Sequence, residues 1–281
     1  MRVRAIKDLN QLSQNDFLQK VSSGLNLILQ NANYLIDDAK LLLERDSNAA
    51  NNGVWILRGI AEEEAAKFLI LIDAVRCPKK HERFEKHLQN FNDHVAKGIY
   101  AKYYNMRPAT LGEIISRVDS YRAEYYLDGP QGIDWIFRNR ISQTREEMMY
   151  VDYIEDDEGH RWQKPNPISM IGGKMYNPEL KRNVLKVSQA LQDVGCTTPE
   201  SLSLMLEFWK DIEMKESFHW QELRKLNISF FEKMESMGLL LDNPNFLIDC
   251  WLFPIYSIDL SLIKVNKQEL REIQERWNPD Y

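Results

Sequence analysis

The most apolar part of the chain is the stretch from Gly53 to Val75, GVWILRGIAEEEAAKFLILIDAV. Its second half holds five consecutive apolar residues, Phe68 to Ile72, bounded by Lys67 and Asp73. A helix that is apolar on every side is either buried or spans a membrane, and this run is far too short to span a bilayer. The pattern therefore predicts one central core helix with other helices packed around it.

This helix has a polar exception at the edge of its core face. The row that follows helical spacing through Phe68 is apolar except at Glu64. Glu63 and Glu64 lie four and three residues before Lys67, so one ammonium group can reach both carboxylates. These charges form either a solvated helix face with ordinary ion pairs or a polar network inside a helix bundle. The spacing alone leaves both interpretations open.

The same spacing of apolar positions predicts further helices on both sides of the central one. They cover residues 16–44, 80–104, 110–126, 133–151, 178–194 and 218–237, and another helix begins at Thr198-Pro199. Gly195 and Gly238 stand where helices usually end. Residues 152–178 are rich in proline, glycine and acidic residues, which predicts a long surface loop. We expect an all-α protein with a helical bundle at 1–155, a loop at 156–178 and a C-terminal helical region at 179–281.

Composition limits the classes of function. The chain has 281 residues and a net charge of −6, so broad electrostatic attraction to nucleic acid or to an anionic membrane is not expected. Cys77, Cys196 and Cys250 lie far apart, which fits a reducing cytoplasm better than a disulfide framework. The sequence predicts no metal, no cofactor, no signal peptide and no membrane span.

Histidines form the first group of candidate chemical residues. His87 and His94 share one row with Lys97 on the helix predicted at 80–104. Seven residues separate the two imidazoles by about 10 Å along a helix, which is too far for both to bind one metal ion. They are either bundle histidines with satisfied hydrogen bonds or groups for proton transfer and phosphate contact.

Arginines form the second group, on the helix predicted at 133–151. Arg138, Asn139 and Arg145 lie on and around one helix just before the predicted loop, and Tyr150 lies near the end of the helix. Surface arginines often serve solubility alone. Guanidinium groups can also bind a phosphate through paired hydrogen bonds and stabilise charge that develops on it.

Several of these segments, taken in order, resemble the AbiV-like abortive-infection family of the HEPN superfamily. The matching segments are NANYLIDDAKLLLERD, IAEEEAAKF, FNDHVAKGIY, REEMMYVDY and RWQKPNP, which together span roughly residues 20–170. The resemblance implies a compact bundle of about four or five helices that often dimerises. It also implies a bacterial protein that halts phage growth by stopping protein synthesis.

Members of this superfamily are commonly metal-independent endoribonucleases. In them an arginine is followed by a polar residue and, four to six positions after the arginine, by a histidine that acts on the RNA 2′-OH. Here Arg138 and Asn139 match the start of the motif, but no histidine follows at the expected distance, and Arg145 comes seven residues after Arg138. Arg145 and Tyr150 have a suitable spacing with tyrosine in the histidine position, although a phenol is a poor base near neutral pH. His94, from a neighbouring helix, is the alternative source of an imidazole.

Two hypotheses follow. In the first, the protein is a phage-defence ribonuclease that acts on RNA through Arg138, Asn139, Arg145, Tyr150 and His94. A polar network of Glu63, Glu64, Lys67, His87 and Lys97 would support this group. In the second, the bundle is a non-catalytic module that binds a phage or host protein and so blocks translation. We expect a homodimer in either case, with a phage-encoded protein as a possible activator.

Overall fold

The computed structural model describes residues 5–45, 52–78, 81–126, 137–156, 159–165 and 183–277, and the structural statements below concern these residues. The fold is all-α, as the sequence predicts, with two short β-hairpins added to it. Its helices are η1 (Ile6–Gln11), α1 (Gln14–Arg45), α2 (Asn52–Arg76), α3 (Phe84–Gln89), η2 (Asn90–Asn92), α4 (His94–Tyr103), α5 (Leu111–Arg122), α6 (Arg140–Met149), α7 (Asn183–Asp193), α8 (Pro199–Trp209), α9 (Trp220–Ser236), α10 (Asn245–Cys250) and α11 (Lys267–Trp277).

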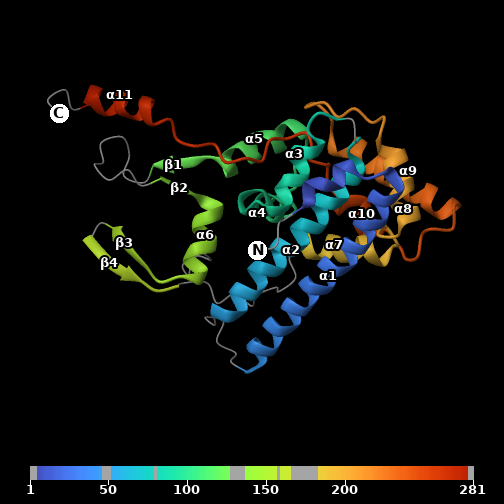
Figure 1. The fold of residues 1–281 in the computed structure, drawn as a ribbon, viewed down its shortest axis with the longest axis horizontal. Coiled ribbons are helices and arrows are strands. Elements are labelled where there is room, and N and C mark those ends of the chain that lie inside the picture. Colours follow the sequence, from blue (N-terminus) through green and yellow to red (C-terminus); the bar gives the residue numbers. More distant parts are fainter. Residues whose placement is uncertain are drawn as a thin grey trace.

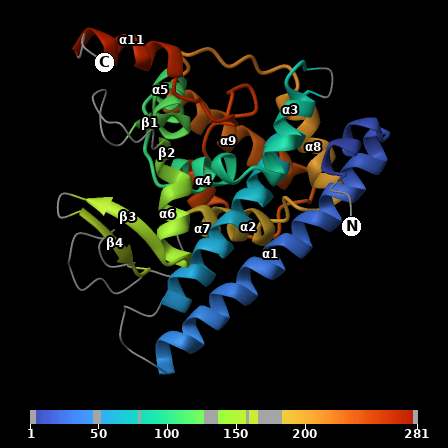
Figure 2. The same ribbon diagram turned by 60° about the vertical axis from the view of Figure 1, so that its left-hand side comes forward.

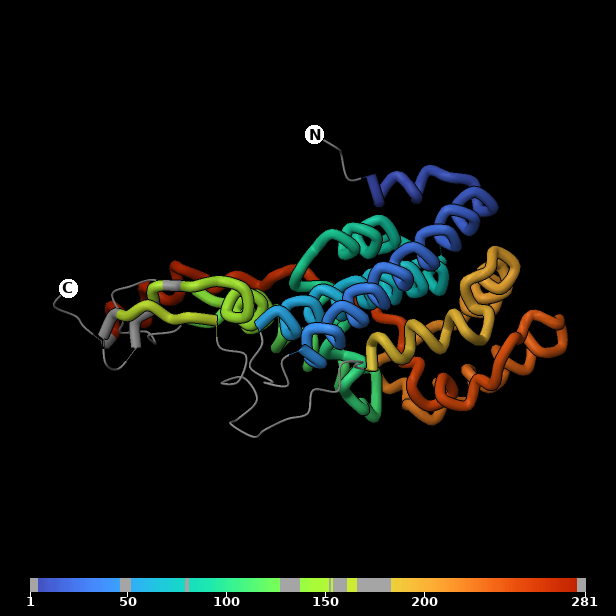
Figure 3. The backbone as a smooth tube through the Cα atoms, turned by 90° about the horizontal axis from the view of Figure 1, so that it is seen from below, coloured from blue at the N-terminus to red at the C-terminus, as the bar shows by residue number. Residues whose placement is uncertain are grey.

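Helices α1 and α2 form a long antiparallel pair along one diagonal of the molecule (Figure 1). α1 is buried along a single stripe that includes Phe17, Leu25, Ala32 and Ala39, because apolar residues recur there at helical spacing. Seen from below in Figure 3, α8, α9 and α10 lie on one side of this pair. The strands and α11 lie at the opposite end of the molecule.

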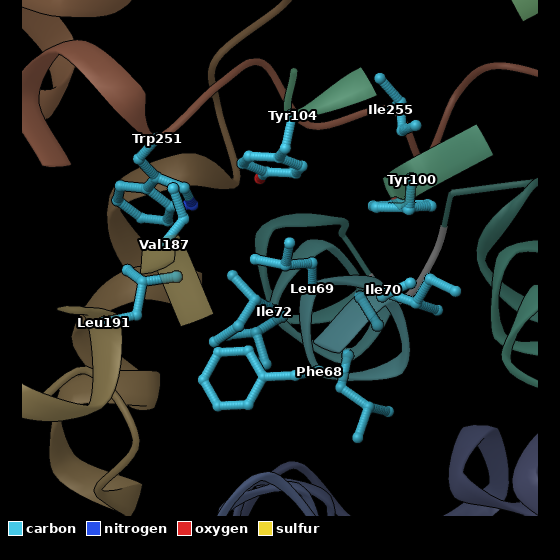
Figure 4. Packing of buried hydrophobic residues seen from close by; sticks show 14 of the residues in the cluster. Phe68, Leu69, Ile70, Ile72, Tyr100, Tyr104, Val187, Leu191, Trp251 and Ile255 are labelled. Atoms are coloured by element: carbon cyan, nitrogen blue, oxygen red, sulfur yellow. The ribbon is translucent and has the colours of Figure 1, made fainter. Parts of the chain in front are cut away.

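Helix α2 is the central core helix. Every residue from Phe68 to Arg76 is buried, as expected for a helix that is apolar nearly all round. Figure 4 looks along this helix and shows its side chains meeting those of α4, α7 and the segment after α10. α2 also contacts α1, α3, α6 and α8, so helices surround it on all sides.

The C-terminal helices share this core. One cluster of buried apolar residues includes Phe68 of α2, Leu191 of α7, Met205 of α8 and Trp251 after α10. A buried polar clamp joins the same parts of the chain. Arg76 donates to Asp73 and to the Leu252 carbonyl, and its guanidinium lies 4.1 Å from the ring centroid of Trp209 and 4.4 Å from that of Trp251.

The helix predicted at 80–104 is in fact broken, so this prediction is wrong. The chain turns at Asp93, whose extended backbone ends η2, and the Asp93 carboxylate caps α4 by accepting from the Ala96 amide at 2.8 Å. An aspartate immediately before a helix competes for the first backbone amides, and this competition outweighs the continuous apolar spacing. His87 on α3 and His94 on α4 therefore do not form one row.

Two β-hairpins replace parts of the helices and loop predicted at 110–178. β1 (Glu124–Tyr126) pairs with β2 (Phe137–Asn139), so the helix predicted at 133–151 begins only at Arg140 and α5 ends at Arg122. β3 (Asp152–Asp156) pairs with β4 (Gly159–Gln163) inside the predicted surface loop. Figure 2 shows the β3–β4 hairpin standing off the bundle beyond α6.

The helix ends in the C-terminal region follow the sequence signals. Thr198 caps α8 through the Ser201 amide, with Pro199 as the first helical residue. Gly195 and Gly238 follow α7 and α9 with φ of 90° and 69°, a conformation that glycine adopts without strain. The start of the helix predicted at 178 lies outside the described residues. Within the described ranges, every helix is too short or too polar to cross a bilayer.

Candidate functional site

The candidate site is built around one carboxylate, that of Glu63 on α2. Its Oε2 accepts from Lys97 Nζ at 2.8 Å and lies 2.9 Å from His94 Nδ1, both on α4. Its Oε1 accepts from Arg145 Nε of α6 at 3.0 Å. Two helices, α4 and α6, thus place an imidazole, an ammonium and a guanidinium around a single carboxylate on a third helix, α2.

Two local features bring α4 and α6 into reach of Glu63. Asp93 caps α4, so that His94 is its first residue and projects from the end of the helix. Asn139 caps α6, accepting from the amides of Ile141 and Ser142. α4 and α6 meet at Gly98, where an added Cβ would lie only 2.2 Å from Ile141 Cγ2. The two helices can approach this closely because Gly98 has no side chain.

The cationic neighbours determine the charge state of Glu63. Burial raises its pKa, but the hydrogen bond from Lys97 and the charges of Lys97, His94 and Arg145 lower it by more, so the pKa lies below its ordinary value of 4.5. Glu63 is therefore ionised at neutral pH. Lys97 is almost fully buried, whereas the side chains of His94 and Arg145 are 48% and 36% exposed and can reach a ligand.

The carboxylate also orients the imidazole. If neutral His94 donates from Nδ1 to Glu63, its Nε2 is left as a hydrogen-bond acceptor. A histidine held by a carboxylate in this way is the arrangement that general bases commonly use. Arg145 binds Glu63 through Nε, which leaves its two terminal nitrogens to contact an anion.

A cleft of about 560 Å³ opens beside this group, between α2, α4 and α6. His94, Glu63 and Arg145 line one part of it. Four Lys and Arg side chains face three carboxylates in its wall, although the whole chain carries a net charge of −6. The cationic residues are Arg58, Lys102, Arg140 and Arg145. The cleft thus offers cationic contacts that the overall charge does not predict.

The structure unites only some of the candidates predicted from the sequence. His94 and Arg145 meet at Glu63, together with Lys97. Arg138 lies in β2 with its Nη1 3.6 Å from Glu146 Oε2, and Tyr150 is exposed just after α6. Asn139 is buried, and both ends of its amide are used: Oδ1 caps α6, and Nδ2 donates to the carbonyls of Tyr121 and Ala123 at the end of α5. Arg138, Asn139 and Tyr150 do not join the group at Glu63.

The predicted polar network is likewise divided. Lys67 pairs with Glu64 and not with Glu63, so the expected sharing of one ammonium between both carboxylates is wrong. This pair is half-buried, next to the Phe91 ring. His87 is fully buried elsewhere, with Nε2 2.9 Å from the Ile70 carbonyl, and burial lowers its pKa. His87 is thus a core histidine and not part of the site.

The sequence patterns did not point to some parts of the site. The cleft wall contains an ion pair of 2.9 Å between Arg58 and Glu62. Their i, i+4 spacing on one helix is a sequence signal that could have indicated this pair. Asn139 directly before an amphipathic segment is a recognisable capping signal. No sequence signal indicates that Gly98 lies against Ile141, because the contact depends on how α4 and α6 cross.

Comparison with known proteins gives one result. A model of the HEPN_AbiV family, described as AbiV, matches residues 20–172, which include most of α1, all of α2 to α6 and both hairpins. No curated protein and no solved structure matches the chain significantly.

Proposed function

Since the chain belongs to the AbiV family of HEPN-type proteins, we propose that it is an anti-phage protein of the abortive-infection kind that cleaves RNA without a metal ion and so stops translation. The observation that carries the proposal is the convergence of His94 and Arg145 on the Glu63 carboxylate. An imidazole can take up the 2′-OH proton and a guanidinium can stabilise the charge on the phosphate, so these two groups suffice for RNA cleavage without a metal ion.

The proposed reaction is a transphosphorylation within the RNA strand. His94 Nε2 accepts the proton of a 2′-OH, and the 2′ oxygen attacks the adjacent phosphorus. The new O2′–P bond forms as the P–O5′ bond breaks, and the 5′ oxygen takes a proton from water. The hydroxide left by that water takes the proton from His94, which returns the imidazole to its neutral form. The products are a 2′,3′-cyclic phosphate and a 5′-hydroxyl end. Glu63 holds the imidazole in place and balances the positive charge that it gains.

Arg145 has the role of stabilising the pentavalent phosphate. Its terminal nitrogens are donors at the cleft, and a guanidinium contacts two phosphate oxygens at once. Lys97 is buried at Glu63 and fixes the carboxylate between His94 and Arg145. Lys97 is therefore a positioning residue in this scheme, since it does not line the cleft.

The proposal includes a cytoplasmic setting, a homodimer and activation by a phage-encoded protein. HEPN domains often dimerise, and this supports the dimer. Light scattering of the purified chain tests it, and a monomer across the micromolar range would contradict it. Growth of cells under phage challenge, with and without the gene, tests the role in defence.

A second function is favoured by one observation. Tyr153 and Trp162 pair across the β3–β4 hairpin with ring centroids 5.0 Å apart, yet their side chains are 55% and 71% exposed. Exposed aromatic pairs are common where proteins bind one another. In this alternative the protein blocks translation by binding a phage or host protein, and it has no ribonuclease activity.

Incubation of the purified protein with tRNA and total RNA in EDTA distinguishes the two functions. We expect cleavage to leave cyclic phosphate ends, and His94→Ala and Arg145→Ala to reduce the rate at least ~100-fold. Arg138→Ala is the matched control, because it removes an arginine that lies outside the cleft. Equal rates for His94→Ala and the parent protein would refute the proposed site. No cleavage by the parent, with Trp162→Ala abolishing phage resistance, would favour the second function.

A further inference from the structure

The cleft beside Glu63 continues past the group of charges into an apolar wall. Along α2, Gly59 lies one helical turn before Glu63, and Trp55 lies two turns before it, about 6 and 12 Å along the axis. Both line the cleft, and so does Met148 of α6. The apolar wall therefore begins about 6 Å from Glu63 along α2. A group attached directly to a phosphate held at His94 and Arg145 would reach it.

Gly59 opens this part of the cleft. A Cβ built on Gly59 would lie 3.5 Å from Met148 Cε, which is ordinary van der Waals contact. Its backbone is helical, so nothing in the backbone requires glycine there. Alanine would fit the space, whereas a longer apolar side chain at this position would extend between Trp55 and Met148 and fill the cleft.

The chemistry of the wall indicates what the cleft holds. Its volume of about 560 Å³ lies in the range of ~300–1,000 Å³ that is typical of small-molecule sites. Apolar surface from Trp55, Ile60 and Met148 lines this part of the cleft. The Gln143 amide and the Thr144 hydroxyl beside it are already bonded to groups of α6 and β1. A flat apolar ring suits such a wall.

We infer that the cleft receives one unpaired nucleobase of the RNA strand, next to the phosphate held at His94 and Arg145, and that Gly59 is the residue that admits it. This inference rests on the proposed function and names its substrate class. The substrate is RNA with an unstacked base at the cleavage point, as in a loop, and not a continuous duplex. Base contacts of this kind depend on stacking and on apolar surface.

The probes are dinucleoside monophosphates with a 2′-deoxy sugar before the phosphate. They cannot be cleaved, and their single phosphodiester fixes the binding register. Binding to the full chain is measured by calorimetry for the complete dinucleotide and for two versions that each lack one base. We expect removal of one of the two bases to weaken binding about tenfold, and removal of the other to change it much less.

The variants test the role of Gly59 directly. Gly59→Leu should bind the complete dinucleotide about tenfold more weakly and should no longer distinguish the two versions that lack a base. Gly59→Ala is the matched control and should bind as the parent does. Melting temperatures of both variants at or above that of the parent show that they are folded, since leucine and alanine favour helix over glycine.

Two results would overturn the inference. One is a change of less than about twofold on removal of either base, or no measurable binding of the complete dinucleotide. The other is a Gly59→Leu protein that binds as tightly as Gly59→Ala. Cleavage of long RNA by the parent protein, together with either result, would leave the proposed ribonuclease intact and remove only the base pocket.

Discussion

The contact between Gly98 and Ile141 leaves no room for a side chain where α4 meets α6. Gly98→Ala adds one methyl group whose carbon would lie 2.2 Å from Ile141 Cγ2, while the next atoms of Ile141 are at 3.4 and 3.5 Å. To reach even 3.4 Å, the added carbon and Cγ2 must move apart by about 1.2 Å, either by rotation of the stiff β-branched side chain of Ile141 or by separation of the two helices. Separation would carry Arg145, one turn further along α6, away from Glu63, where its Nε now lies at 3.0 Å.

The expected cost combines two opposing contributions. Overpacking of a filled core costs ~1–3 kcal/mol, and alanine in place of glycine within a helix contributes about 1 kcal/mol in the other direction. Gly98→Ala should therefore lower the free energy of unfolding by about 0–2 kcal/mol. The ribonuclease rate should fall much more than this stability loss suggests, because a displacement of ~1 Å can cost about a hundredfold in rate.

A double-mutant cycle with Ile141→Ala isolates the contact. Ile141→Ala removes Cγ2, and by itself it should cost ~2–5 kcal/mol because Ile141 is buried. In the double variant the clash is absent, so its loss should be smaller than the sum of the single losses by the overpacking cost, ~1–3 kcal/mol. Urea unfolding followed by circular dichroism measures all four proteins. Losses that add to within about 0.5 kcal/mol would refute the close approach of α4 and α6.

Two further predictions concern charges held by α2. Arg76→Ala should lower the free energy of unfolding by ~3–5 kcal/mol in urea unfolding, because it leaves Asp73 buried without its cation. Arg117→Ala, which removes an exposed ion pair, is the control, and an equal loss would contradict the clamp. Because the pKa of Glu63 is lowered by folding, the unfolded chain binds more protons in acid than the folded chain does. The free energy of unfolding of the parent should therefore fall as the pH falls below about 4.5. This fall should be steeper than that of Glu63→Gln. Parallel curves of urea midpoint against pH for these two proteins would contradict the network.

The sequence by itself determined the central helix and most of the helix ends. The apolar run Phe68–Ile72 can be stable in water only when helices surround it, so its burial follows from composition alone. Thr198, Gly195 and Gly238 act through bonds and dihedral angles within a few residues, and such local signals are read directly from the order of residues. The resemblance to the AbiV-like family is likewise carried by short segments in a fixed order, which the sequence displays without reference to how they pack.

The tertiary structure alone decided which charges meet. Helical spacing placed Lys67 within reach of both Glu63 and Glu64, but Glu63 pairs with His94, Lys97 and Arg145 from helices 31 to 82 residues away. These distances depend on the crossing of α2, α4 and α6, and the crossing depends on the contact of Gly98 with Ile141. A periodic pattern specifies the face of one helix and not its partner, because many packings bury the same apolar area.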